Sequence, residues 1–263
     1  MKRNMIWIRR KGLDLGIFPA AGAIAPGLQV LFHSRRGGSS AGPFASLNMG
    51  MNVGDRRESV LSNRELLLGA AGIAGDRLAR AEQVHGARVA VARGGALHEG
   101  TDGLVTDERD LALCISTADC YPVVIYAPSE RVLAALHVGR NGAAEGIIER
   151  AADMMRGSFR IGTEGTVALI GPGICAGCYE VGEKEAERFP ARFRSGRGAR
   201  CRLDLLSFCR EELRRCGLRS DRIFEAGYCT SCNPRLFYSY RRDGKITGRH
   251  WTLARMLGAR RPR

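Results

Sequence analysis

Residues 111–138 read LALCISTADCYPVVIYAPSERVLAALHV, and this stretch decides the expected fold. It contains three apolar segments of strand length, at 111–116, 121–127 and 131–138, rich in branched and aromatic residues. Short connections join them, as in hairpins, so neighbouring strands should run antiparallel. The first connection carries Asp119 and Cys120, an acid and a thiol next to a strand that should be buried.

Outward from this stretch, the chain alternates further strands with amphipathic helices. Strands are predicted within 27–34, on both sides of Gly86 in 77–92, and within 166–174 and 221–229, and helices within 55–73, 139–157 and 203–217. Residues 236–251 are predicted to form a hairpin that turns at Asp243-Gly244. We therefore expect an α+β (mixed α/β) fold: one domain over residues 1–263, with mixed β-sheets flanked by helices.

Charge and hydropathy narrow the classes of partner. The net charge is +14, and only four of the 41 basic residues are lysines. No arginine block alternates with aromatic residues as on a nucleic-acid platform, so no nucleic-acid partner is expected. The sequence contains no run of 18 apolar residues, so no membrane span is predicted. The apolar stretch 13–32 contains Asp14, Pro19 and Pro26, so we interpret it as mature protein rather than a signal peptide. A cytoplasmic monomer or weak homo-oligomer is predicted.

Nine cysteines, an odd number, favour free thiols in a reducing compartment over a disulfide framework. Two pairs have CxxC spacing, Cys175/Cys178 and Cys229/Cys232. Together they would suit a four-thiolate zinc site, but the separation between the pairs exceeds that of a compact zinc ribbon. The sequence therefore favours separate pairs.

Three side chains of metal-ligating type each follow an apolar run and precede a turn: His85, Cys120 and His137. Two imidazoles and a thiolate make a sound zinc set, with a fourth position left for water or substrate. A second interpretation is a nucleophile and base pair, in which Cys120 attacks and a histidine takes its proton. The third is a buried thiol and two ordinary histidines. Gaps of 35 and 17 positions match no short ligand motif, so spacing alone leaves the three open.

A wider pattern weights these alternatives. Eight segments, in order along the chain, resemble the YfiH-type laccase-domain family, also called multicopper polyphenol oxidases and described as purine nucleoside phosphorylases. They are RRGGSSAGPFASLNMG (35–50), EQVHGARV (82–89), TDGLVTD (101–107), TADCYPVVIYA (117–127), LHVGRNG (136–142), IGPGICAGCYEVG (170–182), LDLL (203–206) and FYSYRRDGKITGR (237–249). The resemblance implies a YfiH-like fold and a catalytic metal site made of His85, Cys120 and His137.

The resemblance also implies an activity. Adenosine, inosine, guanosine or methylthioadenosine would react with phosphate to give free base and ribose 1-phosphate, with adenosine deamination as a side activity. Zinc is the implied cofactor and copper the alternative metal. A single three-ligand cluster fits poorly with the many histidines that several copper ions require.

Substrate contacts are assigned from residue chemistry. Asn48 would position hydroxyls or phosphate, with turn capping as its alternative role. Arg36, beside Arg35, and Arg140 would meet phosphate. Asp119 is assigned to the substrate site, with orientation of a metal ligand as the alternative.

Two further positions bear on these assignments. Asp102 could orient a ligand or cap a turn, and the turn-capping role is favoured. The segment HVGRNG departs from the family's His-Ala-Gly-Trp-Arg/Lys-Gly run, because Arg140 replaces the tryptophan and Asn141 the cation.

Three other functions remain open from the sequence. A Cys/His amide hydrolase of the kind that edits peptidoglycan precursors would use Cys120 as nucleophile. A copper polyphenol oxidase would need oxygen. A non-enzymatic zinc-binding module would explain the HVGRNG departure.

Overall fold

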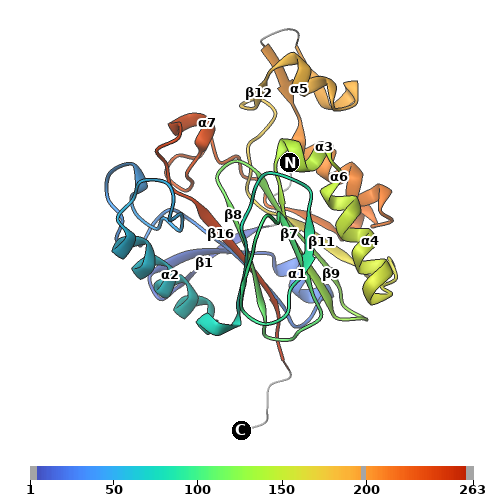
Figure 1. The fold of residues 1–263 in the computed structure, drawn as a ribbon, viewed down its shortest axis with the longest axis horizontal. Coiled ribbons are helices and arrows are strands. Elements are labelled where there is room, and N and C mark those ends of the chain that lie inside the picture. The colour runs from blue at the N-terminus through green and yellow to red at the C-terminus, as the bar shows by residue number, and fades with distance from the viewer. Residues whose placement is uncertain (1–4, 197–199, 259–263) are drawn as a thin grey trace.

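The computed structural model describes residues 5–196 and 200–258 and contains two large mixed sheets (Figure 1). The first has seven strands in the order β1-β2-β3-β16-β8-β4-β6. Their bounds are β1 Ile6–Arg10, β2 Leu13–Ile17, β3 Leu28–His33, β16 His250–Met256, β8 Ala112–Thr117, β4 Leu78–Ala81 and β6 Leu97–His98. Antiparallel pairing runs from β1 to β8, and β4 pairs in parallel with both β8 and β6. The prediction of a mixed sheet is confirmed.

The second large sheet has six strands in the order β15-β11-β9-β10-β7-β5. Their bounds are β15 Ile223–Glu225, β11 Val167–Ile170, β9 Tyr121–Ala127, β10 Val132–Val138, β7 Gly103–Thr106 and β5 Val89–Val91. Residues 121–138 supply its centre, because β9 and β10 form an antiparallel hairpin with His137 opposite Pro122. The pairing expected between the first two runs of the quoted stretch is wrong, because β8 lies in the seven-stranded sheet and β9 in the six-stranded sheet. Both strands are buried along their whole length, which explains why their sequence is continuously apolar rather than alternating.

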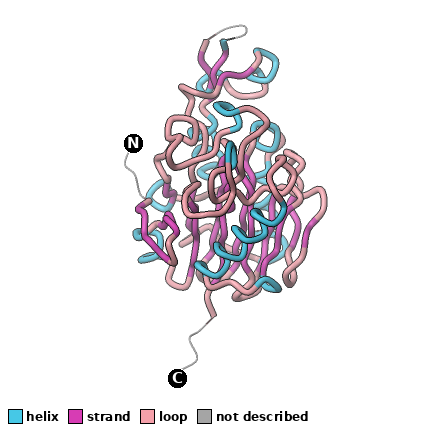
Figure 2. Tube along the Cα trace, turned by 90° about the vertical axis from the view of Figure 1, so that its left-hand side faces the viewer, coloured by secondary structure: helices cyan, strands magenta, loops and turns pink. Residues whose placement is uncertain are grey.

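A small third sheet, in the order β12-β14-β13, projects from one end of the molecule (Figures 1 and 2). Its strands are β12 Glu180–Val181, β14 Cys201–Leu203 and β13 Arg194–Ser195. The helices are α1 Pro19–Ile24, α2 Arg57–Ala71, α3 Arg140–Ala144, α4 Ile147–Phe159, α5 Glu183–Glu187, α6 Leu205–Arg215 and α7 Tyr240–Asp243. The helix predictions within 55–73 and 203–217 are confirmed by α2 and α6.

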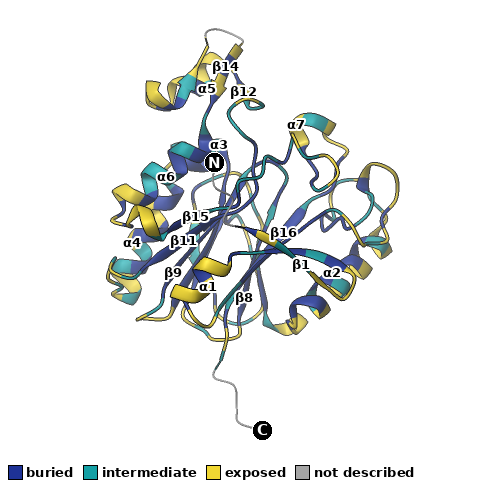
Figure 3. Ribbon diagram, turned by 180° about the vertical axis from the view of Figure 1, so that it is seen from behind, coloured by how far each residue is buried: buried dark blue, intermediate teal, exposed yellow. Residues whose placement is uncertain are grey.

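The two large sheets pack face to face, with helices on their outer faces. Side chains from both sheets, including Ile115 and Val124, share one buried cluster. On the outer face of the six-stranded sheet, Val123 packs with Met155 of α4 and Leu213 of α6. On the other outer face, α2 packs through Leu67. Figure 3 shows the strands largely buried and the outer faces of these helices exposed. Burial of each such apolar side chain contributes about 1.5–3 kcal/mol.

Two elements are arranged differently from the sequence predictions. The short strands on either side of Gly86 belong to different sheets, β4 to the first and β5 to the second. The helix predicted within 139–157 is two helices, because Gly146 adopts a left-handed conformation with φ of 79° between α3 and α4. Both differences move the ends of these elements towards one edge of the sandwich, where polar side chains gather.

The hairpin predicted at Asp243-Gly244 is wrong. Residues Tyr240–Asp243 form the short helix α7, and Arg242 N donates to Ser239 Oγ at 3.2 Å as an N-terminal cap. The strand β16 then starts only at His250. The Asp-Gly signal is local, whereas the hydrogen bond that Ser239 Oγ accepts from Arg242 N closes a helical turn before the chain can reverse.

No helix among residues 5–196 and 200–258 has the length and apolar character needed to cross a bilayer.

Candidate metal centre

Three elements bring His85, Cys120 and His137 together at one edge of the sandwich. His85 lies in the turn between β4 and β5, Cys120 directly precedes β9, and His137 lies on β10. The pairing of β10 with β9 sets His137 beside the start of β9. One donor atom from each residue lies within 4.8 Å of the others. The structure therefore assembles the three candidates that spacing alone could not connect.

Asp102 orients this cluster. The carboxylate is fully buried, and its Oδ1 lies 2.7 Å from His137 Nδ1 and accepts His85 N at 3.0 Å. Its Oδ2 accepts Gly86 N at 2.8 Å and Val84 N at 3.2 Å. A carboxylate that holds one ring nitrogen of a histidine leaves the other nitrogen for a metal. Asp102 therefore does more than close a turn, which corrects the turn interpretation.

The backbone conformation of the ligand loops is unusual. His85 has φ of 62° and Asp119 has φ of 94°, in the region that disfavours side chains. Such residues persist where the surrounding contacts over-determine them, and they gather at functional sites. Here the Asp102 carboxylate fixes the His85 turn by accepting hydrogen bonds from three backbone N–H groups.

Cys120 and His137 act on each other's protonation. Burial alone would raise the pKa of Cys120, but His137 and His85 beside it lower that pKa to about 6. Burial alone would lower the pKa of His137, but Cys120 and Asp102 raise it to about 9. The neighbouring histidines therefore favour the thiolate form of Cys120, which is the form that binds metal.

The residues present fit a metal ion. Two imidazoles and a thiolate are a zinc donor set with one position left open. Gly139 leaves space at the cluster because it has no side chain. A Cβ at this position would lie 3.0 Å from Cys120 Sγ and 3.6 Å from His85 Cδ2. The three residues therefore suit a metal ion, and all three line a cavity.

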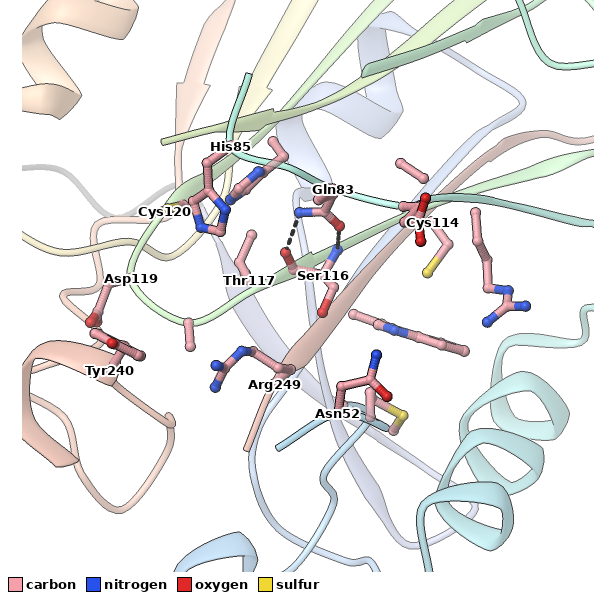
Figure 4. Close-up of a pocket in the computed structure, with 18 of the residues that line it drawn as sticks. Asn52, Gln83, His85, Cys114, Ser116, Thr117, Asp119, Cys120, Tyr240 and Arg249 are labelled. Atoms are coloured by element: carbon pink, nitrogen blue, oxygen red, sulfur yellow. Dashed lines mark hydrogen bonds between the residues drawn. The ribbon is translucent and has the colours of Figure 1, made fainter. Parts of the chain in front are cut away.

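This cavity has a volume of about 730 Å³ and opens beside the cluster (Figure 4). His85 and Cys120 lie on one side, with Arg249 and Asn52 on the other. Five arginines and two acids line it: Arg64, Arg80, Arg140, Arg241 and Arg249, with Glu82 and Asp119. Tyr179, Tyr240 and Trp251 provide aromatic walls. Volume and lining suit a small ligand that combines a flat apolar ring with an anion.

Arg140 meets the cavity beside the metal cluster. Its Nε is buried, and no group in the described part of the chain accepts a hydrogen bond from it. Unpaired buried cationic groups are costly, so such a donor calls for an anion. Arg140 is the residue that the sequence resemblance places where the family run has a tryptophan.

Asn141 carries no charge, but a cation lies beside it. Arg188, just after α5, donates through Nη1 to Asn141 Oδ1 at 3.2 Å. Its Nη2 also lies 3.6 Å from Glu145 Oε1. A guanidinium from another element thus approaches the position where the departure removed a charge.

Two predicted substrate residues lie away from the cavity lining. Asn48 is fully buried, and its Oδ1 accepts Gly50 N and Arg249 N, both at 2.8 Å. Its side chain therefore holds Gly50 and Arg249, which both line the cavity, without lining it itself. Arg36 lines a separate shallow hollow with Arg235, whose carbonyl oxygen accepts Arg36 Nε at 3.0 Å.

Asp119 lines the cavity, but both its carboxylate oxygens are occupied. Oδ1 accepts Thr230 Oγ1 at 2.6 Å, and Oδ2 accepts Arg241 N at 2.7 Å. Its backbone oxygen accepts Ile174 N at 2.8 Å. In this structure Asp119 joins three segments next to Cys120.

His250 is buried, and its Nε2 accepts Tyr238 N at 2.8 Å, so it serves the fold. Sequence reasoning missed the cavity residues Tyr179, Arg249 and Trp251. Tyr179 and Arg249 lie in segments that carry the family resemblance, CYEVG and KITGR, so the signal existed. The sequence carried no signal for Trp251, because only the pairing of β16 with β8 brings this residue to the cavity.

Known proteins match this chain along most of its length. The family model described as multi-copper polyphenol oxidoreductase laccase matches residues 29–257. "Purine nucleoside phosphorylase YlmD" of Geobacillus stearothermophilus is 35% identical, with 91% of this chain and 92% of that protein covered. A "purine nucleoside phosphorylase" of Deinococcus radiodurans is 38% identical, with 87% and 93% covered. The crystal structure of a Bacillus licheniformis hypothetical protein YfiH superimposes with a TM-score of 0.88 at 27% identity, covering 96% of this chain and 99% of that one.

Proposed function

This chain belongs to the multi-copper polyphenol oxidoreductase laccase family, and we propose that it is a zinc-dependent purine nucleoside phosphorylase. Its substrates would be a purine nucleoside and phosphate, and its products a free base and ribose 1-phosphate. The names of the curated relatives support this reaction. The observation in this chain that carries it is half-buried Arg140, which lines the cavity beside His137 and has a buried Nε with no hydrogen-bond partner in the described part of the chain.

His85, Cys120 and His137 would hold the metal, and Asp102 would keep His137 in the ligating orientation. When bound, zinc supplies Lewis acidity and lowers the pKa of a water molecule. This donor set also suits copper, but zinc fits a site with three protein ligands and one open position.

Phosphorolysis requires a held phosphate and a positioned sugar, which is mainly positioning and electrostatics. Arg140 would bind phosphate, because a guanidinium matches its geometry. Arg249 adds positive charge across the cavity, and burial lowers its pKa, so an anion beside it would be stabilising. Both arginines would hold the nucleophile against the sugar.

The purine would lie against the aromatic walls. Tyr179, Tyr240 and Trp251 present ring faces or edges to the cavity, and stacking of a base on an aromatic side chain contributes about 1–3 kcal/mol. These residues would replace the aromatic wall that the absent tryptophan removes. Asp119 would act indirectly, by fixing the Arg241 segment.

The test is product analysis with inosine and adenosine, with and without phosphate. We expect free base and ribose 1-phosphate only when phosphate is present, and loss of both products after metal removal by a chelator. Restoration by added zinc is the control for damage by the chelator. Base release that ignores phosphate would contradict the proposal.

The same assay reads adenosine deamination as a side activity of the metal site. Inosine formed from adenosine without phosphate would show it. We also propose a location in the cytoplasm, because an odd number of cysteines favours free thiols in a reducing compartment.

A second candidate is a Cys/His amide hydrolase. One observation favours it: Cys120 lies beside two imidazoles, and its pKa is lowered to about 6, as in a thiolate nucleophile. A chelator separates the two functions, because it would stop the phosphorylase and leave such a hydrolase active.

A further inference from the structure

We propose that Cys175, Cys178, Cys229 and Cys232 form a second metal site, a closed four-thiolate zinc centre with a structural role. The sequence favours separate CxxC pairs, since Cys178 and Cys229 are 51 positions apart. The structure brings the pairs together, and one sulfur atom from each of the four residues lies within 4.8 Å of the others. This inference does not depend on the proposed phosphorylase activity.

The two loops meet through backbone pairing. Gly173 and Cys229 form a parallel β-bridge, in which Gly173 N donates to Tyr228 O at 3.3 Å and Thr230 N donates to Gly173 O at 3.1 Å. This bridge lies two residues before Cys175 and includes Cys229 itself. The register therefore places Cys175 against Cys229 without help from any ion.

The spacing of the sulfur atoms fits zinc. A tetrahedral site with zinc–sulfur bonds of about 2.3 Å separates its sulfur atoms by roughly 3.8 Å. Cys178 Sγ and Cys232 Sγ lie 3.3 Å apart, and no pair exceeds 4.8 Å. Shifts of a few tenths of an ångström up to about 1 Å would make the set regular. Each pair also has the CxxC spacing of structural zinc sites.

Backbone N–H groups point at one sulfur. Cys229 Sγ accepts Cys175 N at 3.3 Å and Cys232 N at 3.4 Å. Hydrogen bonds to the charged form favour a thiolate, the form that binds metal. One of these donors comes from the opposite loop, so the arrangement prepares the site across the pair.

A cation lies close to the second loop. Arg242 Nη1 donates to Thr230 O at 2.9 Å and to Ser231 O at 3.0 Å, within the CxxC of that loop. Asn233 Nδ2 donates to Cys229 O at 2.7 Å. Four thiolates around one divalent zinc leave two negative charges, and a nearby guanidinium stabilises them. Asp243, the ion-pair partner of Arg242, offsets part of this effect.

A closed site has a structural use here. Four protein ligands leave no open position for substrate. The site would fasten the loop that carries Ile174 and Tyr179 of the cavity lining. It would also fix Thr230, whose hydroxyl reaches Asp119 beside Cys120. The second metal would thus support one wall of the cavity from outside it.

The experiment is elemental analysis of the full-length protein purified without chelator and then supplied with zinc. We expect two zinc ions per chain in the parent and one in Cys229→Ser. Cys232→His should keep two, because histidine also ligates zinc. His85→Ala should keep one, and the two sites would be told apart in this way.

Cobalt supplies an independent readout on a variant that keeps all four cysteines, in case a cysteine variant fails to fold. We expect His85→Ala loaded with Co²⁺ to keep the intense sulfur-to-cobalt absorption of a tetrahedral four-thiolate site. The proposal would be overturned if the parent bound a single zinc ion and Cys229→Ser still retained it. A Cys178–Cys232 disulfide, found by thiol counting without reductant, would overturn it as well, and so would iron in place of zinc.

Discussion

Two clusters of side chains that could ligate a metal lie in the described part of the chain. They differ in the contacts that keep their donor atoms together. His85, Cys120 and His137 come from the strand-rich body and share one buried carboxylate, Asp102. The four cysteines lie on two loops outside the large sheets and are joined by a single bridge and by backbone N–H groups. One set leaves a position open towards a cavity, and the other closes on itself. The comparison teaches that the number of ligands and their support, rather than the thiol itself, separate reactive from structural cysteines.

The largest expected difference is in thiol reactivity. In chelated protein at pH 7, we expect iodoacetamide to modify Cys120 at least about 100-fold faster than Cys175. The pKa of Cys120 is lowered to about 6. Burial and the neighbouring Cys229 raise the pKa of Cys175 to about 11. Peptide mass mapping against pH measures both rates.

The rate at Cys120 should rise through pH 6 and then level, since only the thiolate reacts. Buried Cys114, whose pKa burial raises, is the internal control. Equal labelling of Cys120 and Cys175 at pH 7 would break the comparison. Added zinc should protect both cysteines.

Cys120→Ser should remove metal from the three-ligand site and lower kcat/KM for phosphorolysis by more than about 100-fold. Serine is a poor zinc ligand at neutral pH, whereas its volume is close to that of cysteine. Steady-state assays with inosine and phosphate measure the change. Cys229→Ser, the matched change in the other cluster, should keep kcat/KM within about tenfold. If Cys229→Ser also abolished turnover, the division of roles would fail.

Asp102→Asn should weaken metal binding at the three-ligand site by about 10–100-fold, because the carboxylate orients His137 and carries the compensating charge. Competition with a chromogenic chelator measures this affinity. The four-cysteine site in the same protein serves as the internal control and should keep its metal. Unchanged affinity at both sites would show that Asp102 only fixes the His85 turn.

Arg140→Met should raise KM for phosphate by about 10–30-fold, the size of a lost charged hydrogen bond. KM for the nucleoside should change much less. Arg36→Met is the matched control, because Arg36 lies in another hollow. A larger effect from Arg36 than from Arg140 would place the phosphate elsewhere.

Asp119→Asn should have the smallest effect, on stability. Asp119 links the clusters, since it follows β8 next to Cys120 and accepts Thr230 Oγ1 beside Cys229. Loss of a charged acceptor costs about 1–2 kcal/mol, or a fall in Tm of roughly 2–6 °C. Thermal unfolding of the metal-loaded protein measures it. Thr230→Val should give a similar fall, and an unchanged Tm in both would show that this link is not stabilising.

Local patterns predicted much of this chain. The apolar runs of 111–138 indicated the buried hairpin at the centre of the second sheet, because only strands buried on both faces are continuously apolar. The helical periods within 55–73 and 203–217 indicated α2 and α6. The family resemblance, carried by eight ordered segments, indicated His85, Cys120 and His137, whose donor atoms the structure brings within 4.8 Å of one another.

Other features needed the tertiary structure. The division of β4 and β5 between two sheets, the buried role of Asp102 and the approach of the two CxxC pairs all rest on contacts between segments far apart in the chain. So do the aromatic wall at Trp251 and the unpaired Nε of Arg140. The sequence by itself determined the residue types and the local periods, because these depend on neighbours within a few positions. Only the packed structure decided which donors face one another, because that depends on strand order and register.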